Sequence, residues 1–146
     1  MSLAEILQHK GSRVLSIAPR ATLADVVQKL VKHNVGALMV CEESDCTQML
    51  GIITERDIAY ALPEHLDDLP GMRVSDLMTG TVVTCSPQDS VADAARIMTA
   101  CRIRHLPVKE GGLLVGVISI GDVLKHRLTE IELEANVLRD LAIAGR

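Results

Sequence analysis

Two stretches decide the fold: Gly51-Ile52-Ile53-Thr54-Glu55-Arg56-Asp57 and Gly116-Val117-Ile118-Ser119-Ile120-Gly121-Asp122. Each reads glycine, two apolar residues, a hydroxyl residue, two variable residues and an aspartate. They end two longer segments, 14–62 and 82–128, whose prolines, aspartates and glycines correspond along their length. A duplication of this period predicts two copies of one small unit, each too small to bury its apolar face alone. We therefore expect the functional site where the copies meet.

The composition predicts one domain with an aliphatic core. The chain has 146 residues, 48% of them hydrophobic, but no Phe or Trp and a single Tyr. No apolar run approaches the roughly 20 residues that span a bilayer. The start, MSLAEILQHKGS, lacks the basic and apolar regions of a signal peptide. We expect a cytoplasmic protein with no membrane contact.

Charge and cysteine spacing exclude several functions. A net charge of -4 argues against a general nucleic-acid binder and leaves room for a local basic pocket. The cysteines at 41, 46, 85 and 101 show neither CxxC spacing nor a following histidine cluster, so no metal site is expected. We expect ordinary cysteines in a reducing compartment, with Cys46, in the polar stretch 42–48, exposed and oxidisable.

Each copy predicts strand, helix, strand, strand, helix. In the first, Pro19 ends a strand over 14–17, and Thr22 caps a helix with apolar residues at helical spacing. Apolar runs at 37–41 and 49–53 predict buried strands, followed by a helix that begins near residue 55. In the second copy, Ser90 is the cap and strands are expected over 105–108 and 113–118, joined by a tight loop at 111–112.

Two segments lie outside this pattern. Residues 63–71 contain two prolines and several acids and indicate a linker, and 72–78 has short helical or turn character. From residue 124 to 142, apolar residues recur at alternating spacings of four and three, which favours a helix with a partner. Packing onto the chain's own domain and contact with a second copy both fit this pattern.

The doubled motif has a structural and a functional interpretation. A hydroxyl at a helix start with an acid three residues later can form a capping box. However, the runs 53–57, 102–108 and 117–122 together resemble those of a CBS domain pair, also called a Bateman module, of the small stand-alone bacterial type. The resemblance covers residues 3–128.

That resemblance implies an α+β fold of tandem repeats packed sheet to sheet with pseudo-two-fold symmetry, plus a C-terminal helix. It makes residues 1–146 a single module, with repeats at 8–66 and 74–130 and the additional helix at 130–146. It also implies two clefts between the repeats that bind adenosine-containing ligands such as AMP, ATP, NAD or S-adenosylmethionine.

In the main cleft, the resemblance makes Asp57 the acceptor for two ribose hydroxyls. Arg56, Arg104 and a protonated His105 could contact phosphates, although Arg102 and Arg104 could also be surface charges beside a strand. The predicted residues are Ile52, Thr54, Arg56, Asp57, Met78, Thr79, Val83, Ile103, Arg104 and His105.

The second cleft keeps its acid, Asp122, but departs from the pattern. Gly36 and Ala37 stand where the other copy has Arg104 and His105. We expect this cleft to bind phosphorylated ligands more weakly or to stay empty. Its predicted residues are Lys10, Leu15, Val35, Gly36, Ala37, Val117, Ser119, Gly121 and Asp122.

Catalysis is not expected, because the sequence has no HExxH pair, Gly-x-Ser-x-Gly elbow, Walker lysine loop or GxGxxG. The leading hypothesis is a non-catalytic AMP, ADP or ATP sensor of cellular energy that acts on an unknown regulated protein or through its own homodimer. Alternatives are a redox sensor holding NAD or NADH, a structural interaction module with vestigial clefts, and last an oxidoreductase. No catalytic cofactor is expected.

Overall fold

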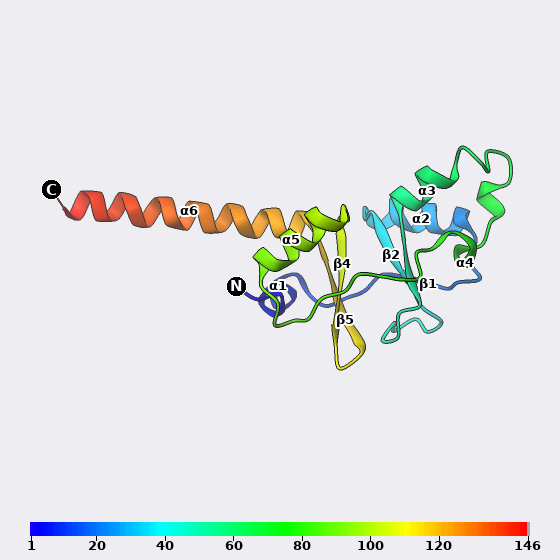
Figure 1. Cartoon of the computed structure of the whole chain (residues 1–146), viewed down its shortest axis with the longest axis horizontal. Helices are drawn as coiled ribbons and strands as arrows, with labels where there is room; N and C mark the ends of the chain where they lie inside the picture. The colour runs from blue at the N-terminus through cyan, green and yellow to red at the C-terminus, as the bar shows by residue number, and fades with distance from the viewer. Residues whose placement is uncertain (146) are drawn as a thin grey trace.

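The computed structural model describes residues 1–145 and contains the two predicted repeats (Figure 1). The first repeat consists of β1 (Ser16–Ile17), α2 (Leu23–His33), β2 (Ala37–Val40), β3 (Gly51–Thr54) and α3 (Glu55–Ala61). The second contains α5 (Val91–Cys101), β4 (His105–Glu110), β5 (Leu113–Ser119) and α6 (Ile120–Ala144). Outside them lie α1 (Leu3–Lys10), η1 (Leu69–Gly71) and α4 (Val74–Leu77). The tandem α+β architecture with a C-terminal helix is confirmed.

Helix starts follow the predicted caps. Thr22, Thr54 and Ser119 each form a complete capping box with the aspartate three residues later. Ser90 also caps its helix, since its side chain accepts a hydrogen bond from the backbone N–H of Asp93. The structural interpretation of the doubled motif therefore holds, and it places both aspartates in the first turn of a helix.

The strands form one small sheet in each repeat. β2 pairs with β1 in parallel and with β3 in antiparallel, and β4 pairs with β5 in antiparallel. The strand that would open the second repeat is reduced to an isolated parallel bridge between Cys85 and Val108. Equivalent contacts recur in both repeats: the N–H of Glu55 donates to the Gly36 carbonyl, and that of Ile120 to the Arg104 carbonyl.

The two short helices that precede the repeats cross over to the other repeat. Leu3 and Leu7 of α1 join the core built by α5, β4 and β5, whereas Val74 of α4 joins the core of α2, β2 and β3. Figure 1 shows α1 beside β5 and α5, at the opposite end of the body from α4. Each repeat therefore packs against the short helix that precedes the other repeat in the sequence.

A third apolar cluster joins the two sheets. It contains Ala37, Met39 and Ile52 from the first repeat and Leu114 from the second. Cys41 and Cys46 belong to it and form a disulfide, with their Cα atoms 5.4 Å apart. The prediction that Cys46 is exposed is wrong: its side chain is 1% exposed, because the polar stretch around it folds back against this interface.

The last helix, α6, runs without a break from the second repeat through the predicted C-terminal helix. Its first turns pack against α5, and the rest projects away from the body (Figure 1). From residue 131 to 145 every residue is exposed. The alternative that this segment packs on its own domain is therefore wrong. Within residues 1–145, no helix combines the length and hydrophobicity needed to cross a membrane.

Candidate functional site

Asp57 sits at the start of α3 with both carboxylate oxygens held in place. Oδ2 accepts hydrogen bonds from the Thr54 backbone N–H at 2.9 Å and from the Thr54 hydroxyl at 3.1 Å. Oδ1 accepts one from the Thr79 hydroxyl at 3.2 Å. Because a carboxylate offers about four acceptor positions, the pre-oriented group can still accept hydrogen bonds from a ligand.

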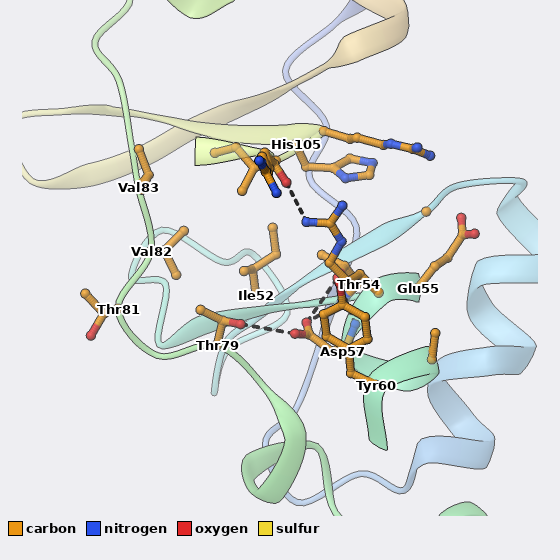
Figure 2. A pocket seen from close by; sticks show the side chains of 16 residues that line it. Ile52, Thr54, Glu55, Asp57, Tyr60, Thr79, Thr81, Val82, Val83 and His105 are labelled. Atoms are coloured by element: carbon orange, nitrogen blue, oxygen red, sulfur yellow. Dashed lines mark hydrogen bonds between the residues drawn. The ribbon is translucent and has the colours of Figure 1, made fainter. Parts of the chain in front are cut away.

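This carboxylate borders a cavity of about 520 Å³ between the repeats. The volume falls within the range typical of small-molecule sites. Figure 2 shows Thr81, Val82 and Val83 along one wall, with Asp57 and Tyr60 on the α3 side and His105 across the opening. Nine of the ten residues predicted for the main cleft line it: Ile52, Thr54, Arg56, Asp57, Thr79, Val83, Ile103, Arg104 and His105.

The tenth residue, Met78, lies behind the cavity. It packs against the core of the first repeat, and its neighbour Thr79 forms the lip of the cavity. Thr79 exchanges two backbone hydrogen bonds with Ile52 of β3, at 2.9 and 3.0 Å. A Cβ on Gly51 would lie 2.6 Å from the Thr79 carbonyl oxygen. The glycine of the motif therefore allows the inter-repeat segment to approach β3.

Three arginines surround the cavity. The Arg56 guanidinium donates to the Arg102 carbonyl at 2.6 Å and lies 5.9 Å from the centre of the Tyr60 ring. Arg102 ends α5 in a left-handed conformation and lies outside any strand, although Arg102 and Arg104 both line the cavity. With Glu55 and Asp57 as the acids, the lining has an excess of one positive charge, which suits an anionic ligand.

His105 faces the cavity (Figure 2). Burial lowers its pKa, while the charge of Glu55 partly opposes that shift. The lowered pKa disfavours a protonated His105, which leaves the arginines as the main source of positive charge for phosphate contact. Gly36, predicted for the second cleft, lies here instead: a Cβ on it would be 2.6 Å from Glu55 Oε1 and 3.2 Å from His105 Cε1.

In the second cleft, the aspartate is paired with a lysine. Lys10 Nζ donates to Asp122 Oδ2 at 2.6 Å and to the Val117 carbonyl at 2.9 Å. Ser119 binds the same carboxylate oxygen through its N–H and hydroxyl. Burial alone would raise the pKa of Asp122, but hydrogen bonds from Lys10 and Ser119 hold it below its usual value. Lys10 would therefore compete with a ligand for Oδ2 of this carboxylate.

The remaining residues predicted for the second cleft are dispersed. Val35 packs into the core of the first repeat and Ala37 into the interface between the sheets. Leu15 borders another cavity of about 750 Å³, which also contains Arg13, Lys29 and Lys32. Gly121 lies in the first turn of α6. Among residues 1–145, no group of three or more histidine, cysteine or acidic side chains could hold a metal ion.

Sequence reasoning missed seven residues of the main cavity. Two of them had a local signal: Tyr60 lies one helical turn after Arg56, and Val82 adjoins the predicted Val83. Others, such as Gly36, depend on contacts between repeats that no local pattern specifies. The full set is Gly36, Glu55, Ala59, Tyr60, Thr81, Val82 and Arg102.

Comparison with known proteins agrees with this architecture. The CBS domain family model matches residues 4–64 and 74–129. The CBS domain-containing protein CBSX3, mitochondrial, of Arabidopsis thaliana is 32% identical over 130 residues, which are 85% of this chain and 63% of that protein. This chain thus spans less than two-thirds of that relative.

Solved structures give the same result. The CBS-domain containing protein ATU1752 from Agrobacterium tumefaciens superposes with a TM-score of 0.82 at 36% identity, covering 87% of this chain and 99% of that one. CBSX2 in complex with AMP, at 24% identity and a TM-score of 0.69, shares the fold over 88% of this chain and 96% of that one. The chain belongs to the CBS domain family and carries two CBS repeats.

Proposed function

We propose that this chain is a non-catalytic regulatory module that binds an adenine nucleotide of the AMP, ADP or ATP type in the cavity beside Asp57. The observation that carries the proposal is the oriented Asp57 carboxylate at the edge of a 520 Å³ cavity built from both repeats. A ligand that spans both repeats stabilises one arrangement of them, which a partner protein can read.

The chemistry of the lining matches the parts of such a ligand. The Asp57 carboxylate is the acceptor for ribose hydroxyls, and Ile52, Val82 and Ile103 offer apolar contacts to a planar base. Phosphate groups would be neutralised by the arginines, foremost Arg104. CBSX2, with the same fold, was solved in complex with AMP, which supports this ligand class.

The proposal also includes three features that are expectations from the sequence. The module acts without catalysis, in the cytoplasm, and through a regulated protein or a second copy of itself. It spans residues 1–146, with repeats at 8–66 and 74–130 and the additional helix at 130–146. The Asp57 cleft is the tighter site and the Asp122 cleft the weaker one.

A thermal-shift panel with AMP, ADP, ATP, NAD, NADH and S-adenosylmethionine tests the proposal. A dye gives the readout because the chain has no Trp. A ligand at about 100 times its dissociation constant stabilises the fold by about 2.7 kcal/mol, a shift of several degrees. A shift with NAD or NADH but with none of the AMP series would replace the energy sensor with a redox sensor.

The two aspartates provide a matched pair of variants. Asp57→Ala and Asp122→Ala each remove the acid of an equivalent capping box, so their cost in helix stability should be similar. We expect Asp57→Ala to abolish the nucleotide shift and Asp122→Ala to keep it. The opposite result would show that the nucleotide binds in the Asp122 cleft and would contradict the proposal.

A further inference from the structure

An apolar seam runs along α6, from its second turn through the part that projects from the body. Its large residues are well exposed: Leu124 is 57% exposed, Leu128 60%, Ile131 61% and Leu138 67%. Their spacing is that of the a and d positions of a coiled coil, where two helices interlock side chains. The seam consists of Leu124, Leu128, Ile131, Ala135, Leu138 and Ala142.

The seam lies on a different face of α6 from the one that contacts the body. Val123 is 4% exposed and the His126 side chain 9% exposed, because both face the second repeat. At about 100° of rotation per residue, the seam is centred roughly 120° around the helix from these residues. A second helix can therefore lie along the seam without displacing the body.

The charged residues that flank the seam favour a second copy of α6 as the partner, in parallel orientation. In this seam, Leu128, Ala135 and Ala142 take the a positions. In a parallel, in-register pair, the residue just before an a position faces the residue five places later in the other helix. Arg127 would face Glu132 of the second copy, and Glu134 would face Arg139 of the second copy. Since every such contact occurs twice by symmetry, the parallel pair gains four contacts between opposite charges.

The antiparallel pair is disfavoured by the same residues. The register that aligns the two seams places Leu124 against Ala142 and brings Glu132 and Glu134 each near their own copies. It also places Lys125 near Arg139. Like charges at these positions repel. We propose that α6 forms a parallel, in-register, two-stranded coiled coil with a second copy of this chain.

Sedimentation of the ligand-free protein tests the seam independently of nucleotide binding. Ile131→Glu should weaken the dimer at least 30-fold, because it places two like charges in the centre of the seam. Leu133→Glu is the matched control: Leu133 is 60% exposed, against 61% for Ile131, but lies on the opposite side of α6. A monomeric wild type, or equal effects of the two variants, would overturn the proposal.

Cross-linking tests the direction. In a Cys101→Ser background, Ala142→Cys should form a covalent dimer on oxidation, because the two copies of residue 142 meet only in a parallel pair. In an antiparallel pair these residues would lie about 27 Å apart along the axis. Failure to cross-link, with efficient cross-linking between Leu124→Cys and Ala142→Cys chains, would establish the antiparallel pair.

Charge reversal gives a second test of direction. Glu134→Arg should weaken the dimer several-fold by placing two arginines together, and the double variant Glu134→Arg/Arg139→Glu should restore it. Only the parallel pair joins these two positions, so a double variant as weak as the single one would contradict it.

Discussion

Lys10 is paired with the acid of the second cleft, and its removal should free that acid for a ligand. The ammonium group lies 2.6 Å from Asp122 Oδ2 and 2.9 Å from the Val117 carbonyl, so it takes two acceptors from any ligand. Lys10→Met keeps most of the length of the side chain and removes its charge and its hydrogen bonds. We predict that this variant binds a second equivalent of AMP, in the cleft that contains Asp122.

The size of the effect follows from the contacts that a ligand must displace. The lysine side chain is 36% exposed and that of Asp122 20%, so the ion pair is only partly shielded from water. Such a pair contributes about 0.2 to 1 kcal/mol, and the hydrogen bond to Val117 a further ~0.5 to 1.5 kcal/mol. Without Lys10, a ligand no longer has to displace contacts worth about 1 to 2 kcal/mol in total. The affinity of this cleft should therefore rise about 5- to 30-fold.

Isothermal titration calorimetry with AMP measures both the stoichiometry and the affinity. Wild type should bind one equivalent, and Lys10→Met two, the second lost on addition of Asp122→Ala. Lys32→Met, an exposed lysine of α2, controls for the change in net charge. Two equivalents in the wild type, or a single unchanged site in Lys10→Met, would show that Lys10 does not compete with a ligand there.

Three further predictions concern stability. Gly116→Ala should cost about 1 to 3 kcal/mol in urea unfolding, because its Cβ would lie 2.6 Å from a Leu7 methyl group, whereas Gly121→Ala should not destabilise. Leu3→Ala should cost about 2 to 5 kcal/mol, since Leu3 is fully buried against the second repeat; an effect below 1 kcal/mol would contradict the crossover of α1. Because the folded-state pKa of Asp122 is lowered, the ionised carboxylate stabilises the fold above about pH 4, and this stabilisation is lost as pH falls through the lowered pKa. Asp122→Asn should therefore flatten the dependence of the unfolding free energy on pH.

Features encoded within a few residues could be predicted from the sequence. The caps Thr22, Ser90 and Ser119 follow from a hydroxyl residue three places before an acid, and the strands from short apolar runs. The duplication then pairs the two aspartates, and nine of ten predicted residues of the main cleft line one cavity. Local patterns and internal repetition were sufficient for this part of the site.

Features that depend on contacts between the repeats could not be predicted from local sequence patterns. The helix α1 is only eight residues long, and its apolar residues are buried by the second repeat, far along the chain. Cys46 lies in a polar stretch, which indicates exposure, but the adjoining sheet covers it. The resemblance placed Lys10 and Asp122, 112 positions apart, in one cleft, but it did not predict that they form an ion pair. In each case the deciding neighbour is set by tertiary packing.

The second cleft and the dimer seam lie on the same helix. Ser119 caps α6 and Asp122 lies in its first turn, so the hydrogen bonds that hold the acid of this cleft also fix the start of the helix that carries the seam. The main cleft is also connected to the start of α6. Arg104 lines the cavity, and its carbonyl accepts a hydrogen bond from the N–H of Ile120, the first residue of α6. A ligand that shifts Arg104 therefore acts on the base of α6. Since linkage is reciprocal, a dimer that favours one position of α6 must favour the matching state of the cleft to the same extent.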